Sequence, residues 1–537
     1  MKKLLLSLIL CCAVFTFVEA QVWNANLSGA KYQNPILYAD YSDPDVCRAG
    51  DDYWMTASSF NCSPGLPILH SKDMVNWELV NYALPVQTPL EVFSKTQHGG
   101  GVWAPAIRFH KDTFYIYYGD PDYGIYMLKT ADPRGEWSTP VMVKAGKGLI
   151  DPAPLWDEDG KAYISHAWAG SRAGLKSVVG VFPMSPDGSR AIGETRIVFD
   201  GHEGHATIEG TKFHKRNGYY YILAPAGGVT HGWQVALRSK NVYGPYEVKT
   251  VMHQGNTAIN GPHQGAWVET PRGEHWFYHF QDLKEYGRVV LLQPMQWVND
   301  WPIMGEDKDG DGCGEPVASY SKPNVGRRAT PIAPPESDEF DKNVIGLQWQ
   351  WHANANPLWS FADAANGRLR LYSHEKPENY VSLWQQPNLL LQKFPAPEFR
   401  ATTKISFSPD PRYKGERTGL LVMGYDYAVL GLENTDKGLL LFQSACKNAN
   451  RNGKEIINSS LLVEQNSLYL RVEVWKGGKC YFFYSEDNVN FKPLGLEFQA
   501  NTGQWIGAKM GMFITRPAAS NDGGWVDVDW FRVEKLF

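Results

Sequence analysis

The sequence predicts an all-β protein in which a five-bladed β-propeller is followed by a C-terminal β-sandwich of the concanavalin or jelly-roll type. The first observation is a repeat, in which a turn rich in Gly, Asp, Asn or Lys leads directly into an aromatic-rich strand. This pattern returns roughly every 50 to 60 residues, a period typical of propeller blades. The second observation is that short alternating strands without helical periodicity replace the repeat over roughly the last 200 residues. The five copies begin at Gly50, Lys111, Asp159, Asn217 and Arg272.

Three changes of composition divide the chain. We assign the propeller to residues 21–321, since each aromatic strand needs about three neighbours to complete a blade. Residues 322–337 are rich in Pro and Arg, and we interpret them as a linker. Residues 338–537 are expected to form the sandwich, because polar and apolar residues alternate in segments such as 368–372 and 468–474.

The N-terminus has the features of a secretory signal. A basic start is followed by an apolar run to Val18, and Ala20 stands before the expected cleavage point. This pattern predicts removal of residues 1–20 and a periplasmic or secreted protein. The apolar run is short for a membrane-spanning helix, and Leu10 precedes Cys11 where a lipoprotein signal needs a small residue. No later stretch is long and apolar enough to span a bilayer, so the mature chain is expected to have no membrane span.

Charge and cysteine content narrow the classes of function. The formal net charge of −5 and the lack of a basic run do not support binding to nucleic acid. The chain without its signal holds an odd number of cysteines, which cannot all pair within one molecule. Cys47 and Cys62 flank the first blade strand and could pair, but we favour buried free thiols. The five are Cys47, Cys62, Cys313, Cys446 and Cys480.

A polar loop near residue 310 resembles the start of a calcium-binding loop. Asp307, Asp309 and Asp311 alternate as the first ligands of an EF-hand do, and Gly312 follows. The twelfth position, counted from Asp307, is Ala318 rather than the bidentate Glu that such a loop requires. We therefore interpret this segment as a polar surface loop.

Three carboxylates lie inside apolar or aromatic segments, where a free charge is costly. Asp43, Asp151 and Glu209 each come shortly before a repeat, at the same phase of the period. Because the innermost strand of each blade starts near the propeller axis, equal phase predicts that all three point into one central depression. Converging carboxyl groups suit glycoside hydrolysis, in which one acts as base on a water molecule and another donates a proton to the departing oxygen.

Taken together, these residues resemble glycoside hydrolase family 43, in its two-domain β-xylosidase and α-L-arabinofuranosidase branch. The resemblance covers nearly the whole mature chain and implies an exo-acting, inverting enzyme that removes terminal L-arabinofuranosyl or D-xylosyl residues from plant cell-wall polysaccharides or oligosaccharides. It implies that Asp43 is the general base, with Asp45 as its rival, that Asp151 modulates the pKa of the acid, and that Glu209 is the general acid. The matching segments are 34–36, 42–45, 101–105, 150–152, 208–210 and 287–288.

The same resemblance implies further site residues. Phe60 and Trp103 match aromatic positions that line the sugar pocket, although core packing would also explain Phe60. Arg288 matches an arginine that reaches substrate hydroxyls. His263 matches an axial histidine that contacts substrate or holds Ca²⁺ or water near the propeller axis, while no cofactor is required for the chemistry. The loop 516–523 of the sandwich is the expected contributor to the pocket rim.

Three alternatives stay open at this point. An endo-acting arabinanase would share the carboxylates but have an open cleft. A non-catalytic sugar-binding propeller would have the fold without needing all three acids. A phosphorylase acting on mannosides would need a basic phosphate site, and no Arg or Lys cluster lies near the three acids in the sequence. The sequence does not decide between arabinofuranose and xylose, nor does it give an oligomeric state.

Overall fold

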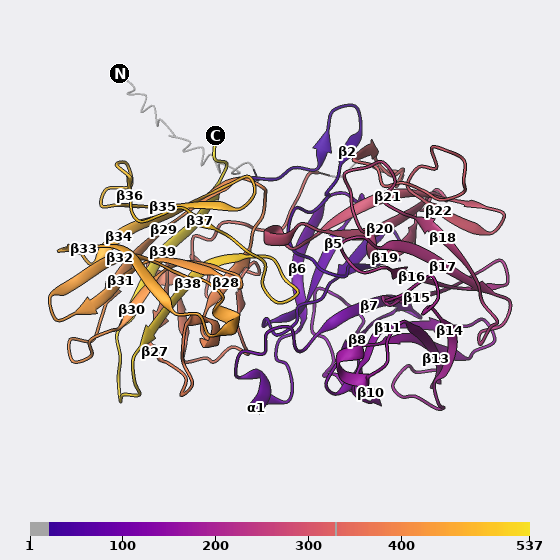
Figure 1. Cartoon of the computed structure of the whole chain (residues 1–537), viewed down its shortest axis with the longest axis horizontal. Coiled ribbons are helices and arrows are strands. Elements are labelled where there is room, and N and C mark those ends of the chain that lie inside the picture. The colour runs from indigo at the N-terminus through magenta and orange to yellow at the C-terminus, as the bar shows by residue number, and fades with distance from the viewer. Residues whose placement is uncertain (1–20, 328–329) are drawn as a thin grey trace, which may run out of the picture.

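The computed structural model describes residues 21–327 and 330–537, which form two lobes side by side (Figure 1). The expected signal at residues 1–20 lies outside the described residues. The described chain is almost entirely β-structure, with the four-residue helices α1 (Leu90–Phe93) and α2 (Gly170–Ala173) and four short 3₁₀ turns. None of the helices in these two ranges is long and apolar enough to cross a membrane.

The first lobe is a propeller of five four-stranded antiparallel sheets, which confirms the predicted fold. Each aromatic-rich segment of the repeat is the second strand of its blade, and the strand before it is the innermost. The innermost strands lie around the axis, where β3 contacts both β7 and β19, and β11 contacts both β7 and β15. In chain order the blades are β3–β6 (Asp45–Ala49, Asp52–Thr56, Gly65–Ser71, Trp77–Leu84), β7–β10 (Trp103–His110, Thr113–Asp120, Gly124–Thr130, Val141–Ala145), β11–β14 (Leu149–Trp156, Ala162–Trp168, Val178–Met184, Arg196–Asp200), β15–β18 (Lys212–Arg216, Tyr219–Ala226, Trp233–Ser239, Glu247–Met252) and β19–β22 (His263–Glu269, His275–Asp282, Arg288–Val298, Trp301–Met304).

Buried tyrosines explain why the second strands are aromatic. Tyr117, Tyr221 and Tyr278 are fully buried in β8, β16 and β20. Their rings fill the space between neighbouring blades, and each hydroxyl donates to a backbone carbonyl, those of Gly188, Asp300 and Met74. A buried phenol is costly unless its hydroxyl finds such an acceptor. The repeat is therefore a packing requirement of the blades.

The ring of blades is held closed by the segment before the first blade. Leu37 pairs with Val290 of β21, the third strand of the last blade. The Asn34 side chain bonds the backbone of Leu292 and Val317 at 2.8 to 2.9 Å. A three-stranded sheet of β1 (Asn26–Leu27), β2 (Lys31–Gln33) and β23 (Ser319–Ser321) joins the two ends of the lobe. The first and last blades are thus tied together without a shared sheet.

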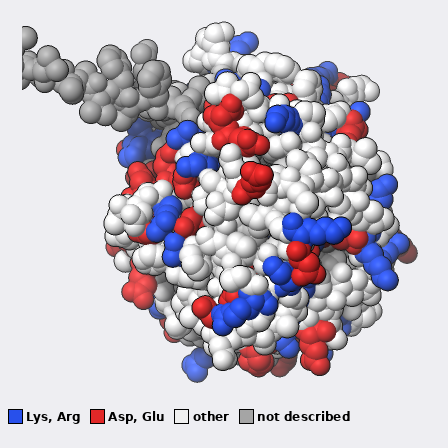
Figure 2. All heavy atoms as spheres, turned by 90° about the vertical axis from the view of Figure 1, so that its left-hand side faces the viewer, with Lys and Arg blue, Asp and Glu red and all other residues white. Residues whose placement is uncertain are grey.

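The second lobe is a β-sandwich of two eight-stranded sheets, again as predicted. Its core is a large apolar cluster between the sheets, which includes Leu420, Leu430 and Val472. Figure 2 shows the end of this lobe, with Lys, Arg, Asp and Glu interspersed rather than gathered by sign. One sheet holds β24 (Gln350–Trp351), β27 (His374–Glu375), β28 (Leu390–Lys393), β30 (Arg417–Met423), β31 (Tyr427–Thr435), β32 (Gly438–Cys446), β33 (Glu455–Val463) and β38 (Lys509–Arg516). The other holds β25 (Ser360–Asp363), β26 (Arg368–Tyr372), β29 (Phe399–Ser408), β34 (Ser467–Trp475), β35 (Lys479–Ser485), β36 (Lys492–Pro493), β37 (Phe498–Gln499) and β39 (Trp525–Glu534).

The two lobes contact each other through buried polar and aromatic groups. The Tyr286 hydroxyl donates to Pro397 O and accepts from the amides of Gly477 and Gly478. His98 of the propeller stacks on Trp384 of the sandwich, with ring centroids 3.4 Å apart. These contacts fix the sandwich relative to the propeller axis.

The cysteines are free thiols. All five cysteines of the described residues are buried and unpaired, including Cys47 and Cys62, so the favoured interpretation is confirmed. The Cys62 sulfur lies 3.0 Å from the Lys509 ammonium across the lobe interface. These cysteines therefore act as small buried side chains and not as a covalent framework.

Candidate active site

One pocket at the propeller axis brings together the three predicted carboxylates. Asp43 precedes β3 of the first blade, Asp151 lies in β11 of the third, and Glu209 precedes β15 of the fourth. The pocket that they line has a volume of about 120 Å³ and is open to solvent. Its other lining residues are Phe60, Trp103, Ala104, Ile150, Gln264, Arg288 and Trp505.

An unusual backbone conformation is found at two of the three acids. Asp43 has φ of +55° and Asp151 has φ of +56°, in the left-handed region that residues other than Gly rarely adopt. The register between β11 and β12 shifts between Ile150 and Ala153, so the strand bulges at Asp151. Bulges and left-handed residues redirect side chains and concentrate at functional sites.

Asp43 is held by an arginine and two hydroxyl groups. It is 4% exposed, and its Oδ2 accepts hydrogen bonds from Ser42 Oγ at 2.8 Å and Ser58 Oγ at 2.6 Å. Arg288 Nη1 lies 3.1 Å from Asp43 Oδ1 and also donates to Ser42 Oγ. The guanidinium compensates the buried negative charge, and the three donors fix the orientation of the carboxylate.

Asp45, the alternative candidate for the general base, belongs to a different network of ion pairs and hydrogen bonds. It is fully buried in β3, where its Oδ2 accepts from Arg108 Nη1 at 2.5 Å and from Ile107 N at 2.7 Å. Lys212 Nζ lies 3.7 Å from its other oxygen. Asp45 does not line the pocket. It therefore ties neighbouring blades together and is not placed to act as the base.

Asp151 is buried next to the peptide bond between Glu209 and Gly210. It is 4% exposed, and its Oδ2 accepts from Gly210 N at 2.6 Å. Burial is the main reason that the pKa of Asp151 rises to about 7, and the charge of Asp43 adds to the rise. Asp151 thus holds the segment that carries Glu209, and the two carboxyl groups compete for ionisation.

The properties of Glu209 suit a proton donor. Its side chain is 36% exposed and faces the pocket. Desolvation first, and then the neighbouring charge of Asp151, raises the pKa of Glu209 to about 8. A carboxyl group in this state keeps its proton at neutral pH, as a general acid must.

Gly210 and Gln264 pack against each other beneath the acids. A Cβ atom on Gly210, which has φ of +63°, would lie 2.2 Å from Gln264 Cγ. Gln264 also has a positive φ, of +38°, and its side chain lowers the pKa of Asp151 by hydrogen bonding. Gln264 was not among the residues predicted from the sequence, because glutamine has no acid–base role, although it directly follows the predicted His263.

The aromatic predictions fall in the pocket wall. Phe60 and Trp103 both line the pocket, with ring centroids 6.5 Å apart in an edge-to-face arrangement. Trp103 Nε1 donates to Gly99 O at 2.7 Å, which fixes the indole plane. Phe60 is 3% exposed, so it combines core packing with a position at the pocket.

A third aromatic residue comes from the sandwich. Trp505 is 46% exposed and stands between β37 and β38, with its ring centroid 6.3 Å from that of Trp103. The Asp40 carboxylate accepts from Gly507 N and Arg288 N, both at 3.0 Å, and so anchors this loop to the propeller. The predicted rim loop 516–523 is not part of the pocket lining, which corrects that expectation. Its Arg516 instead bonds Ser373 O within the sandwich.

His263 lies behind Glu209 and not in the pocket wall. Its Nε2 is 3.6 Å from Glu209 Oε1, and neither ring nitrogen has a hydrogen-bond partner among the described residues. Burial and the nearby Arg288 lower the pKa of His263 to about 3, so the ring is neutral. Because Ca²⁺ prefers oxygen ligands, the two unpartnered nitrogens fit a water molecule better than Ca²⁺.

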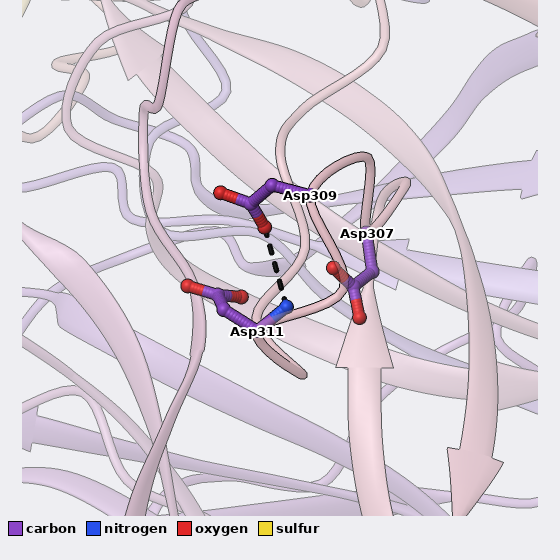
Figure 3. A group of neighbouring side chains, drawn as sticks. All are labelled: Asp307, Asp309 and Asp311. Atoms are coloured by element: carbon purple, nitrogen blue, oxygen red, sulfur yellow. Dashed lines mark hydrogen bonds between the residues drawn. The ribbon is translucent and has the colours of Figure 1, made fainter.

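The three aspartates of the polar loop gather at the surface. Carboxylate oxygens of Asp307, Asp309 and Asp311 lie within 4.8 Å of one another (Figure 3). The loop is shaped by its own hydrogen bonds, such as those from Gly310 N and Gly312 N to Asp307. None of these residues lines the axial pocket. The position agrees with a polar surface loop.

A central pocket that combines three acids from different blades with aromatic walls fits the chemistry of a glycoside hydrolase. The comparisons with known proteins agree. Residues 32–302 match the model of glycosyl hydrolases family 43, and residues 337–534 match that of the β-xylosidase C-terminal concanavalin A-like domain. The chain belongs to glycosyl hydrolase family 43, as its motifs implied.

Relatives match along most of the chain. A candidate β-xylosidase of Xylanibacter ruminicola is 36% identical over 93% of this chain and 89% of its own length. A non-reducing end α-L-arabinofuranosidase of Bacteroides ovatus is 31% identical, over 79% of this chain and 81% of its own. The crystal structure of a family 43 protein of Bacillus licheniformis superposes with a TM-score of 0.80 at 25% identity, covering 94% of this chain and all of that one.

Proposed function

We propose that the protein is an exo-acting, inverting glycosidase that removes terminal L-arabinofuranosyl or D-xylosyl residues from plant cell-wall polysaccharides or oligosaccharides. The observation that carries this proposal is the pairing, in one pocket, of an arginine-bound carboxylate at Asp43 with a carboxyl group at Glu209 whose pKa is raised to about 8. Glycoside hydrolysis by a pair of carboxyl groups requires one group of each kind, and the family resemblance implies that this one proceeds with inversion.

The proposed mechanism assigns one role to each acid. Asp43 takes a proton from a water molecule, which attacks the anomeric carbon from the face opposite the leaving group. Glu209 gives its proton to the departing glycosidic oxygen. Asp151 favours the protonated form of Glu209 and, through its bond to Gly210 N, holds the segment carrying that acid. Proton transfer between these carboxyl groups and water is sufficient, so we propose that no cofactor is required.

The exo mode is supported by the sandwich. Trp505 lines the pocket with its ring centroid 6.3 Å from that of Trp103, so the second lobe adds an aromatic wall to the site. A wall on this side favours a pocket for one terminal sugar, whereas an endo-acting arabinanase needs a cleft open at both ends. The relatives named as a β-xylosidase and an arabinofuranosidase support the two pentoses as candidate substrates.

Paired nitrophenyl substrates test the proposal. We expect turnover of nitrophenyl α-L-arabinofuranoside, β-D-xyloside or both in phosphate-free buffer, and NMR should show the product first in the inverted anomeric form. Glu209→Ala should spare substrates with good leaving groups, which need little protonation, and lose ~10²–10⁴-fold on natural oligosaccharides. Equal losses on both would refute the assignment of the acid. A phosphate requirement would instead indicate a phosphorylase.

Location and metal dependence have their own tests. We propose that the chain is exported and cleaved after Ala20, which mass spectrometry of the protein secreted to the periplasm or medium would check. Activity retained after chelation with EDTA would agree with a metal-free mechanism. Loss of activity that Ca²⁺ restores would contradict it and direct attention back to His263.

A further inference from the structure

One loop of the propeller carries both a residue that holds the base and a residue of the pocket wall. We refer to residues 57–64, between β4 and β5, as the wall loop. In this loop Ser58 Oγ donates to Asp43 Oδ2 at 2.6 Å, and Phe60 lines the pocket. The position of the wall loop therefore affects both the base and the space for the sugar.

Phe60 has a backbone conformation that needs support from its surroundings. Its φ of +50° lies in the left-handed region, which a bulky aromatic residue rarely adopts. Such a conformation persists only where neighbouring groups fix it. One support is the backbone of Val102, because Phe60 N donates to Val102 O at 3.0 Å and Val102 N donates to Phe60 O at 3.3 Å.

Gln87 provides a second support. It is 3% exposed, and its Nε2 donates to Phe60 O at 2.8 Å and to Cys62 O at 3.2 Å. One carboxamide thus bonds two carbonyl groups of the wall loop. A Cβ atom on Gly101 would lie 2.2 Å from Gln87 Oε1 and 2.7 Å from Phe60 O. A side chain at residue 101 would therefore displace either the carboxamide or this carbonyl.

The sandwich holds Gln87 in turn. Asn354 Oδ1 accepts from Gln87 N at 2.9 Å, and Asn354 Nδ2 donates to Gln87 O at 2.8 Å. The side-chain amide thus pairs with both backbone groups of one residue, as a neighbouring β-strand would. Asn354 is 7% exposed, and its own backbone N donates to Phe93 O of α1 at 2.7 Å. These bonds fix Gln87 from the second lobe.

Neighbouring residues of the sandwich bond the wall loop directly. Ser63 N donates to Trp351 O at 3.1 Å, and Trp351 N donates to Ser63 O at 2.6 Å. Asn61 Nδ2 donates to His352 O at 2.7 Å. These residues are buried, and paired polar groups in a buried contact favour one relative position of the two surfaces. Residues 351–354 of the sandwich therefore lie along the wall loop and hold it.

From these contacts we propose that Gln87 and Asn354 are positioning residues of the active site, which hold the wall of the sugar pocket through hydrogen bonds that begin in the sandwich. Asn354 orients Gln87, and Gln87 fixes the carbonyl group of Phe60. Neither Gln87 nor Asn354 lines the pocket, so each acts through the wall loop. The inference rests on the proposed function, in which this pocket binds the terminal sugar.

Steady-state kinetics on nitrophenyl arabinofuranoside and xyloside test this role. Gln87→Met keeps the length of the side chain and removes the donor to Phe60 O. We expect KM to rise ~5- to 10-fold with a smaller change in kcat, because the wall contacts the sugar in the ground state and the transition state alike. Asn354→Leu should have a weaker effect of the same kind. Because both residues act along one path, the double variant should be no worse than Gln87→Met alone.

Amide hydrogen exchange followed by mass spectrometry gives a readout that does not depend on turnover. Peptides that cover the wall loop should exchange at least ~5-fold faster in Gln87→Met and in Asn354→Leu. Tyr32→Phe is the matched control, since it removes one buried hydrogen bond of the propeller, from Tyr32 Oη to Leu292 O at 2.7 Å. It should leave both KM and the exchange of the wall loop unchanged. If Asn354→Leu does not fold, Asn354→Asp, which keeps the acceptor for Gln87 N, replaces it.

Several outcomes would overturn the proposal. An unchanged KM or an unchanged exchange rate in Gln87→Met would do so, as would additive effects of the two substitutions. Equal changes in Tyr32→Phe would show that a general loss of stability explains the kinetics. A native protein that turns over neither nitrophenyl glycoside would contradict the proposed function instead, and the exchange experiment would still decide whether Gln87 and Asn354 hold the wall loop.

Discussion

Replacing Trp505 with alanine tests whether the sandwich shapes the pocket. A tryptophan offers up to about 250 Å² of surface, and Trp505 retains 46% exposure in the free protein. This leaves ~115 Å² open, of which a terminal sugar would cover about half. At ~25 cal/mol per Å², the lost contact amounts to ~1.5 kcal/mol, or about a tenfold weakening. Because the contact is made equally in the ground and transition states, we expect KM to rise and kcat to stay nearly constant.

Steady-state kinetics on nitrophenyl arabinofuranoside and xyloside would measure this effect. Trp530→Ala is the matched control, since Trp530 is half-buried on β39 of the same lobe and does not line the pocket. An unchanged KM would mean that the sugar does not contact Trp505. A loss in kcat alone would mean that the loop positions the acids rather than binding substrate, and either result would refute the reasoning.

Three further predictions concern the acids and their support. Asp43→Ala should reduce turnover of natural and activated substrates alike by on the order of 10³-fold, and activity retained on nitrophenyl glycosides would exclude Asp43 as base. Glu209 must hold its proton, so kcat/KM should fall as pH rises through about 8, the raised pKa of this group. If the same fall in kcat/KM is still seen in Glu209→Gln, another residue causes it. Gly210→Ala places a methyl group 2.2 Å from Gln264 Cγ and should lower kcat on the order of 100-fold with an unchanged circular dichroism spectrum. Normal activity would show that the Gly210–Gln264 contact is not needed.

The blades and the three acids were predictable because both follow from local, repeated sequence. An aromatic strand after a tight turn has to be buried between blades, as Tyr117 and Tyr278 are. Equal phase then places Asp43, Asp151 and Glu209 at equivalent ends of innermost strands, and all three line one pocket. The repeat period therefore predicts which residues lie close together in the fold, which no single motif does.

Residues whose position at the pocket depends on how the two lobes pack together could not be predicted from the repeat. Trp505 lies in a loop without periodicity, and it reaches the pocket because the sandwich is fixed to the propeller at Asp40 and Tyr286. The loop 516–523 has a composition equally suited to a rim but faces its own lobe. For Asp45, neither its burial nor its ion pair with Arg108 of the next blade was evident from the sequence.

Asp40 connects the shape of the pocket with its chemistry. Its carboxylate accepts from the amide of Arg288, whose side chain binds Asp43, and from Gly507 in the loop that carries Trp505. Burial raises the pKa of Asp40, while the charge of Lys393 and these two amides lower it. Because the same buried carboxylate supports both the base's arginine and the sandwich loop, a propeller without its second lobe would lose the Trp505 wall of the pocket and one hydrogen-bond partner of Asp40 together.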